Sequence, residues 1–500
     1  MNTSKKGILN IVTTLISQVV IIVTGVLIPK LILASYGSET NGLINSVTQI
    51  INYFSLFEAG VGLAALQALY RPVSFNNRFE ISKIMVAANN FYKKTGLFYI
   101  LSVLLLAILY PFFINTNIPY IVIFLIIIFS GLGNSIHFIY QAKYKLLMQA
   151  EGNSYVISFV TTIIQIILCF ARIILMYMGY DIILVQFSYF AVCILQMIIY
   201  HIYVKFHYNW LDYNVDPNNE SLSQKNSTLI HQISSLILNS TDVLLLTLLT
   251  KNLKIVSVYT VYNLIVTMVT TLIQQINSGF DFKLGQLFNT DKNTYVICFE
   301  AMETFNAILS FTSISIAYIF IVPFVRIYTA GITDINYIKA GYALFFLIGP
   351  LLTMLRIPSN SMVNYAGHFR KTQWRAIIET AINLSVSIAL IPKFGIYGAL
   401  AGTIIALLYR TNDLILYCHK HLLNNKAYSS YKKIICGLVI FIGVVLFCDN
   451  MKFYTSYIVL LKDCIFYGII IFVLVSIVEL IACRKEIINF IRFLRKEEQK

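Results

Sequence analysis

The chain contains 500 residues, of which 58% are hydrophobic and only 12% are charged, whereas an ordinary soluble protein carries about 25% charged residues. Together with a mean hydropathy of +0.76, this composition excludes a soluble globular fold, and no polar block is long enough for a soluble catalytic domain. The net charge of +15 comes from 37 Lys and Arg that fall mainly between apolar runs, which indicates membrane topology rather than nucleic-acid binding.

Apolar runs separated by short polar, Gly or Pro segments predict an all-α integral membrane protein with about 14 transmembrane helices. We expect the spans at 8–34, 41–70, 80–113, 118–148, 153–178, 182–206, 228–250, 255–286, 294–325, 337–365, 374–391, 396–419, 431–448 and 454–482. A β-barrel is disfavoured because runs such as 121–128 are apolar at every position rather than at alternate ones. The first run is longer than a signal-peptide core and no small-residue cleavage site follows it, so we expect it to remain in the protein.

The distribution of basic residues predicts that both termini lie in the cytoplasm. With the N-terminus inside, most Lys and Arg fall on cytoplasmic segments and few on outer ones, in agreement with the positive-inside rule. The tail 484–500 is basic and amphipathic, which is typical of a helix that lies on anionic lipid, although a solvated tail that only enforces topology is the alternative. The outer loops are short, the longest running from about 326 to 336, which disfavours catalysis outside the membrane.

A faint internal repeat divides the chain. The matching pairs are Gly60 with Gly279, Gln67 with Gln286, Pro111-Phe112 with Pro323-Phe324, and Ala150-Glu151-Gly152 with Tyr365-Ala366-Gly367. Six predicted helices separate the members of each pair, so the two repeats cross the membrane in the same direction. Two parallel six-helix lobes around a central cavity are typical of an alternating-access transporter.

The repeat predicts the organisation of the whole chain. We expect an N-terminal six-helix lobe at 1–208, a cytoplasmic linker at 209–227, a C-terminal six-helix lobe at 228–424, two additional transmembrane helices within 425–483, and the tail 484–500.

Several segments carry a resemblance to a known family. They are Lys5-Lys6 before the first span, the stretch 57–62 leading to Tyr70-Arg71-Pro72, the turn 149–153, and Thr241-Asp242 before a leucine run. With these features, the chain resembles the bacterial polysaccharide (oligosaccharide-lipid) flippases of the polysaccharide transporter family, in the multidrug/oligosaccharidyl-lipid/polysaccharide exporter superfamily.

The resemblance implies a function and a location. Such a protein moves undecaprenyl-diphosphate-linked oligosaccharide repeat units from the inner to the outer leaflet of the bacterial cytoplasmic membrane, for capsule, exopolysaccharide or cell-wall polysaccharide synthesis. It also implies that helices 1, 2, 7 and 8 line the cleft between the lobes. The partners implied are the lipid-linked oligosaccharide, membrane lipids, a polysaccharide polymerase and glycosyltransferases, and no nucleic acid.

Three arginines inside predicted spans are the first candidates for substrate binding, because a charge within the membrane usually faces a cavity or a partner. They are Arg172, Arg356 and Arg410. Arg356 is the strongest of them, since it lies between Pro350 and Pro358, where a broken helix must line a cavity or be buried in protein. A planar guanidinium suits diphosphate oxygens. The alternative is that each arginine pairs with a carboxylate or reaches to an interface, and Asp413 lies one turn beyond Arg410.

Neutral amides form a second set of candidates. Asn45, Gln49 and Asn52 recur at helical spacing in the second span, and Gln274 and Asn277 do so more loosely in the eighth. Such amides suit sugar hydroxyls, but hydrogen bonds between helices would produce the same pattern.

Two acids are candidates for binding a coupling proton or cation, or for acting as counter-ions to the arginines. They are Glu58 in the second span and Asp242 in the seventh, with Glu300, Glu303 and Glu379 as further acids within spans. An interhelical hydrogen bond or a salt bridge inside one lobe is the alternative for both.

We expect neither a metal site nor a cofactor. The seven His do not cluster, the eight Cys lie singly in or beside apolar segments, and no nucleotide-binding motif is present. The sequence therefore favours a transporter over an enzyme. Two alternatives remain: a cation-coupled multidrug exporter, favoured if acids alone line the cavity, and a membrane-embedded enzyme of glycan assembly, favoured by paired catalytic groups on a sizeable outer loop.

Overall fold

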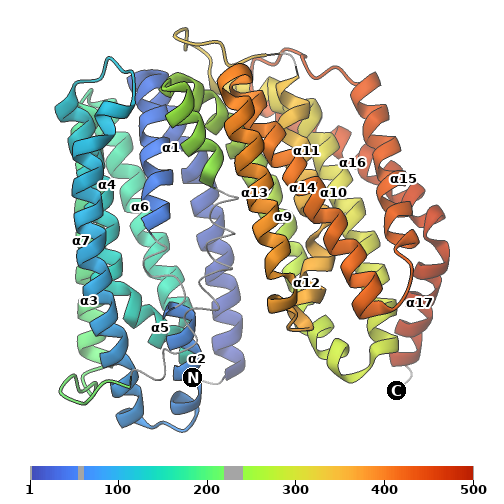
Figure 1. Cartoon of the computed structure of the whole chain (residues 1–500), viewed down its shortest axis with the longest axis horizontal. Coiled ribbons are helices and arrows are strands. Elements are labelled where there is room, and N and C mark those ends of the chain that lie inside the picture. The colour runs from blue at the N-terminus through green and yellow to red at the C-terminus, as the bar shows by residue number, and fades with distance from the viewer. Residues whose placement is uncertain (1–2, 55–60, 219–239, 340, 499–500) are drawn as a thin grey trace. The chain divides into compact units, whose positions relative to one another are not determined.

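The computed structural model describes residues 3–54, 61–218, 240–339 and 341–498, and these residues form helices joined by short loops (Figure 1). The α-helices include α1 (Thr3–Phe54), α2 (Val61–Ser74), α3 (Arg78–Leu109), α4 (Tyr120–Ile136), α5 (Ala142–Ala150), α6 (Ser154–Tyr177), α7 (Ile182–His207), α9 (Leu253–Thr290), α10 (Lys292–Tyr328), α11 (Tyr342–Leu355), α12 (Ile357–Tyr365), α13 (Phe369–Phe394), α14 (Ile396–Cys418), α15 (Tyr428–Phe447), α16 (Tyr457–Ala482) and α17 (Arg484–Glu498). The fold is all-α, as predicted, and no strand occurs in these ranges.

The helices match the predicted spans closely. Within the described ranges, 12 helices are long and apolar enough to cross a membrane, and Ser240–Thr250 forms a shorter apolar helix. The first of the 12, Val12–Phe54, is interrupted at Gly37, whose φ of 81° and ψ of 177° lie in a region that only glycine occupies readily. Since α1 therefore contains two helical segments, the structure is consistent with the predicted number of spans.

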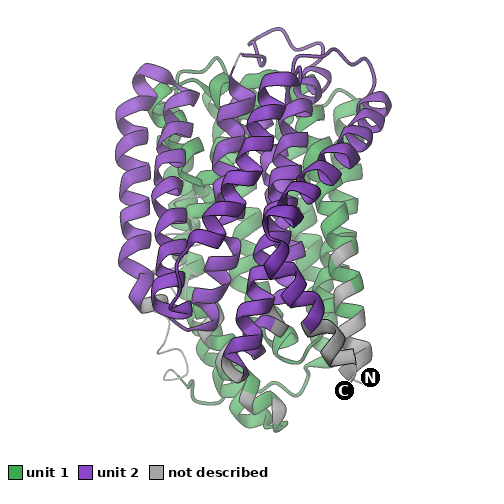
Figure 2. Cartoon of the chain, turned by 90° about the vertical axis from the view of Figure 1, so that its right-hand side faces the viewer, with its two compact units in different colours: residues 1–257 green, residues 258–500 purple. Residues whose placement is uncertain are grey.

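The chain forms two compact units, residues 1–257 and 258–500, which Figure 2 colours separately. The boundary falls inside α9, so residues 240–257, which the sequence groups with the second lobe, pack within the first unit. Buried hydrogen bonds hold them there: Asn41 Nδ2 donates to Ser257 Oγ at 2.7 Å, and the hydroxyls of Ser46 and Thr247 lie 2.8 Å apart.

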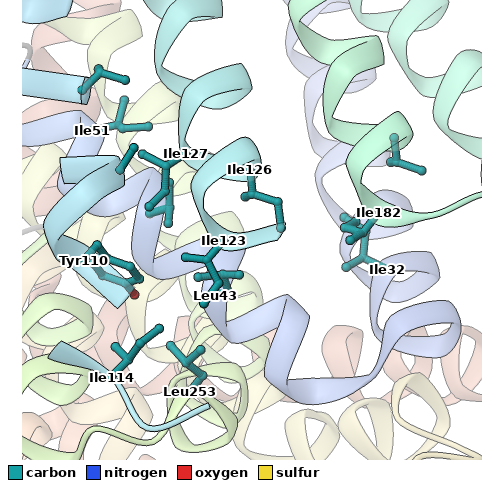
Figure 3. Packing of buried hydrophobic residues seen from close by; sticks show 14 of the residues in the cluster. Ile32, Leu43, Ile51, Tyr110, Ile114, Ile123, Ile126, Ile127, Ile182 and Leu253 are labelled. Carbon is teal, nitrogen blue, oxygen red and sulfur yellow. The ribbon is translucent and has the colours of Figure 1, made fainter. Parts of the chain in front are cut away.

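The core of the first unit lies where α1, α3, α4 and the start of α9 meet. Leu43, Tyr110, Ile123 and Leu253 converge there (Figure 3). Small residues allow the helices to approach closely: a Cβ on Gly42 would lie 2.7 Å from the carbonyl carbon of Leu253. In a membrane, such close packing, rather than exclusion of water, is what associates helices.

In the second unit, α10 is the central helix. It packs against α11, α15, α16 and α17, and most of its length is buried. Gly437 of α15 lies directly on the ring of Phe311, where a side chain would collide with it. This contact anchors the two additional C-terminal helices to the unit.

The two units repeat the same local structures. Asn77 and Asp291 cap α3 and α10 by accepting hydrogen bonds from backbone N–H groups of the first turn. The turns that follow α5 and α12 are closed by the same pattern of backbone hydrogen bonds, and each contains a glycine at positive φ, Gly152 at 72° and Gly367 at 63°. The match of these turns in the sequence is therefore also a match of backbone geometry.

The helices before these turns are irregular in both units. A π-helical turn, His137–Gln141, joins α4 to α5, and Arg356 separates α11 from α12. The break between Pro350 and Pro358 is thus located at Arg356. Irregular turns of this kind often mark functional positions within helices.

Candidate functional site

A cavity of about 290 Å³ lies within the first unit, between the two segments of α1 and the helices α6 and α7. Its polar lining consists of Thr24, Asn41, Asn45, Gln165, Arg172 and Tyr189, and the remaining lining residues are Ile21, Gly25, Ile28, Pro29, Ile32, Ile44, Leu168 and Cys169. Among the described residues, no carboxylate lines this cavity, which we call the Arg172 pocket. Its only formal charge is therefore positive.

Arg172 is held in the pocket by neutral groups alone. Its Nη2 donates to Gln186 Oε1 at 3.1 Å, and its guanidinium lies 5.5 Å from the centre of the Tyr189 ring. Its Nε is buried without a hydrogen-bond partner, and no carboxylate in the described part of the chain forms a salt bridge with it. Burial of an uncompensated charge costs several kcal/mol, so such a group is usually retained for a ligand.

The orientation of Arg172 is fixed by a chain of hydrogen bonds. Gln186 Nε2 donates to Ser130 Oγ at 2.8 Å, and this hydroxyl donates to the carbonyl of Ile126 at 2.7 Å. The amide of Gln186 is thereby turned so that its oxygen faces Arg172. Rigid support of this kind keeps a binding group in one geometry.

Of the three amides predicted to share one face of the second span, only one lines the Arg172 pocket. Asn45 lines the Arg172 pocket, and its Nδ2 donates to the carbonyl and to the Oδ1 of Asn41 at 2.8 and 3.2 Å. Gln49 and Asn52 lie further along the helix, outside the pocket lining, where Asn52 Nδ2 lies 3.4 Å from Gln49 Oε1. Of the three amides, Asn45 is the one that the structure brings together with Arg172.

The second unit contains a network of five charged side chains on α13, α14 and the break before α12. Arg356 Nη1 donates to Glu379 Oε1 at 2.6 Å, and Arg410 Nε lies 3.4 Å from Glu379 Oε2. Arg410 Nη1 also donates to Asp413 at 3.2 Å, and Asp413 accepts a further hydrogen bond from Arg375. Glu379 and Arg410 are only 2% and 7% exposed. Three guanidinium groups share two carboxylates, so the network keeps one excess positive charge.

Arg356 and Arg410 thus lie beside carboxylates, the alternative that the sequence left open for them. The structure joins them through Glu379, a residue that the sequence placed only among the secondary acids. Arg375 completes the network and was not among the predicted candidates, because it lies at the very start of its predicted span 374–391. The helical spacing of Arg375 and Glu379, four residues apart, is the signal that could have identified Arg375.

Asn277 and Gln274 lie in different environments. Asn277 is buried, and its Nδ2 donates to Asn306 Oδ1 at 2.9 Å, while Asn306 Nδ2 donates to the carbonyl of Met354 at 3.0 Å. This chain of amides joins α9, α10 and α11, which is the interhelical alternative. Gln274 is exposed.

The predicted ion-binding acids are only partly described. Asp242 is buried, with 6% of its surface exposed, and the hydroxyl of its neighbour Thr241 lies 2.6 Å from Tyr53 Oη. Glu58 lies outside the described residues. Within the described ranges, no group of three or more His, Cys, Asp or Glu is arranged to hold a metal ion.

The comparisons with known proteins concern the fold. No protein-family model matches the chain, and no curated protein sequence matches it either. Among solved structures, an inward-facing multidrug resistance MATE family transporter of the MOP superfamily aligns with a TM-score of 0.62 at 11% identity, over 87% of this chain and 100% of that one. The lipid II flippase MurJ, in an inward closed conformation, aligns with a TM-score of 0.61 at 14% identity, over 96% of this chain and 100% of that one.

A third structure is a MOP superfamily transporter from Pyrococcus furiosus, whose binding pocket is described as having reverse polarity. It aligns with a TM-score of 0.56 at 12% identity, over 89% of this chain and 97% of that one. These similarities extend over nearly the whole length of the chain. They show that the chain has the fold of membrane transporters of the MOP superfamily.

Proposed function

We propose that this protein is a flippase that moves lipid-linked oligosaccharide repeat units, carried on undecaprenyl diphosphate, from the inner to the outer leaflet by alternating access. One observation carries the proposal: the Arg172 pocket contains a guanidinium for which the described residues supply no counter-ion. A diphosphate is the part of such a cargo that needs a cationic partner, and a guanidinium donates well-aligned hydrogen bonds to phosphate oxygens. Asn45 and Gln165 add amides suited to sugar hydroxyls.

A cation-coupled multidrug exporter is the second candidate, because the MATE transporters share this fold. A pocket for cationic drugs would be lined by carboxylates, whereas the Arg172 pocket presents an arginine and, among the described residues, no acid. The charge network in the second unit also carries excess positive charge. Both observations favour an anionic cargo.

An enzyme of glycan assembly is the third candidate, and it has the least support. The aligned structures are those of transporters and a flippase. The segment between α10 and α11, where the longest outer loop was predicted, joins two helices over a short distance in the sequence. It offers no sizeable outer domain for a donor and an acceptor, so we propose that the protein is not an enzyme.

The proposal predicts the lipid content of a host that lacks this gene. We expect an undecaprenyl-diphosphate oligosaccharide to accumulate on the cytoplasmic side while the surface polymer is lost, as measured by lipid extraction and mass spectrometry. Unchanged lipid pools, together with altered sensitivity to cationic drugs, would favour the multidrug exporter instead.

The role of the Arg172 pocket is tested by the transport that variants of the protein restore in the same host. We expect Arg172→Gln to restore roughly 10- to 100-fold less transport than the unaltered protein, because a hydrogen bond to a charged group contributes about 1.5–3 kcal/mol. Lys93→Gln, which removes a positive charge from an exposed position on α3, is the matched control and should restore transport fully. Full transport by Arg172→Gln at normal protein levels would remove Arg172 from the site.

A further inference from the structure

A second group of buried charged residues lies where α10, α15 and α16 meet, far along the chain from the Arg172 pocket. Lys433 of α15 is only 1% exposed. Its Nζ donates to Glu303 Oε2 at 2.8 Å and to the carbonyl of Glu300 at 3.1 Å. The ammonium group of Lys433 is therefore already neutralised by one carboxylate of α10.

A second carboxylate at this junction has no such partner. Glu479 of α16 is 0% exposed, although most side chains of α16 are not buried. Its Oε1 is buried without a hydrogen-bond partner, and its Oε2 lies 4.0 Å from the Sγ of Cys483. No salt bridge to Glu479 forms among the residues that the structure describes.

Within the described residues, the other titratable groups around Glu479 form no salt bridge with it. Lys432 Nζ donates to the carbonyl of Ala482 at 2.5 Å, and Glu486 of α17 accepts a hydrogen bond from Ser429 Oγ at 3.2 Å. Cys436 on α15 and Cys483 after α16 are the nearby thiols, and burial is the main cause that raises the pKa of Cys483 to about 11. Cys483 therefore remains a neutral thiol at neutral pH and can only donate a weak hydrogen bond.

The charges at the junction balance if Glu479 carries a proton. With Lys433, Glu303 and Glu479 all ionised, the buried group would hold one uncompensated negative charge. An isolated buried carboxylate costs several kcal/mol, whereas a neutral carboxylic acid costs only what its unmade hydrogen bonds cost. The lower-energy form pairs Lys433 with Glu303 and leaves Glu479 neutral.

We propose that Glu479 is a proton-binding site. Its carboxyl group holds a proton in the conformation described here. When Glu479 loses that proton, Lys433 becomes its counter-ion and is then shared with Glu303. The proton passes from the carboxyl oxygen to water. Lys433 keeps all three of its protons and changes only the acceptors of its hydrogen bonds. Proton release therefore changes how α16 is joined to α10 and α15. This site is independent of the proposed cargo and of the Arg172 pocket.

Infrared spectroscopy of the purified full-length protein in lipid nanodiscs tests the proposal directly. A protonated carboxyl group has a C=O stretching band that an ionised carboxylate lacks. At neutral pH we expect such a band in the unaltered protein and its loss in Glu479→Gln. Glu80→Gln, at a partly exposed carboxylate on α3 that accepts a hydrogen bond from Lys83 Nζ at 3.3 Å, should leave the band unchanged. A spectrum without a band that Glu479→Gln removes would overturn the proposal.

A second variant tests the exchange of partners. In Glu303→Gln, Lys433 loses its carboxylate, so we expect Glu479 to ionise in its place and its band to disappear. Persistence of the band in Glu303→Gln would refute the shared role of Lys433. Because glutamine has the shape of a protonated glutamate, Glu479→Gln should also unfold at an unchanged temperature; a marked decrease would mean that Glu479 is ionised in the native protein. None of these measurements depends on transport.

Discussion

The arginines within the predicted spans are of two kinds, which distinguish the two units. Arg356 and Arg410 are neutralised by Glu379 and Asp413, whereas Arg172 is held by an amide and a tyrosine ring. The sequence predicted that all three lie within spans, because the apolar runs around them are unambiguous. It could not assign their partners, since Glu379 and Gln186 lie on other helices and only the pair Arg410 and Asp413 has a helical spacing.

The charge network predicts that replacing one of its arginines and replacing one of its carboxylates change the stability of the protein by different amounts. Arg356→Gln leaves two arginines with two carboxylates, so we expect the variant to fold and to accumulate normally, and to lose export if Arg356 contacts the cargo. Glu379→Gln leaves three arginines with Asp413 alone, and breaking a buried pair costs about 3–5 kcal/mol. Thermal unfolding of the purified variants, combined with an export assay, separates the two roles.

If Arg356→Gln unfolds at as low a temperature as Glu379→Gln, Arg356 is a structural partner of Glu379, and its proposed contact with the cargo has no support. If Arg356→Gln is both stable and fully active, Arg356 does not belong to the site.

His368, in the turn after α12, predicts a dependence of stability on pH. Lys371 Nζ lies 3.1 Å from its Nε2, and an ammonium group can only donate, so Nε2 accepts and Nδ1 donates to Tyr417 Oη at 2.9 Å. Burial, followed by the charges of Lys371 and His421, lowers the pKa of His368 below its ordinary value of about 6.5. The folded protein thus holds this histidine neutral to a lower pH than the unfolded chain does.

As the pH falls through about 6.5, the unfolded chain therefore binds a proton before the folded protein does, and stability decreases until the pKa of the folded state is passed. We expect His368→Asn to reduce this decrease, because asparagine does not titrate. Asn153 occupies the equivalent place in the matching turn, so the substitution suits the backbone. Unfolding temperatures of both proteins from pH 7 to pH 5 provide the measurement, and identical profiles would show that His368 does not contribute.

At the scale of elements, the predicted spans and the observed helices agree within a few residues wherever both can be compared. The long apolar runs and the turns with Gly or Pro made this possible, since they are local signals. The π-helical turn His137–Gln141 was not predicted. It inserts a residue into the predicted span 118–148, and no Gly or Pro within the turn marks the place.

The close contact at Gly42 predicts a large effect from a small substitution. In Gly42→Ala, the new methyl group would collide with the carbonyl of Leu253 at the start of α9, so we expect a loss of roughly 1–3 kcal/mol. Gly443→Ala is the matched control, because no atom lies within 4 Å of the added Cβ, and it should be neutral or stabilising by about 0.5–1 kcal/mol. Thermal unfolding of both variants compares them, and equal stabilities would show that the helices can separate at Gly42 without cost.

At the scale of the whole molecule, the sequence predicted an all-helical membrane protein with an internal repeat, and the fold agrees with MOP superfamily transporters. The boundary between the units was harder to predict. Residues 240–257 pack within the first unit through Asn41, Ser46 and Tyr53, and contacts between residues so distant in sequence leave no periodic signal. The same reason explains why the sequence predicted only Arg172 and Asn45 among the residues that line the Arg172 pocket, which three helices form.

The unpaired guanidinium of Arg172 also has an electrical consequence. Moving a unit charge across the whole membrane changes its electrostatic energy by about 2.3 kcal/mol for every 100 mV of membrane potential. In the network of the second unit, two carboxylates cancel two of the three arginine charges, so a displacement of that network moves one net charge through the field. Arg172 contributes its full charge when its helix moves, unless a bound anion cancels it. Under the proposed function, the protein would therefore respond to membrane voltage differently with an anionic cargo in the Arg172 pocket and without one.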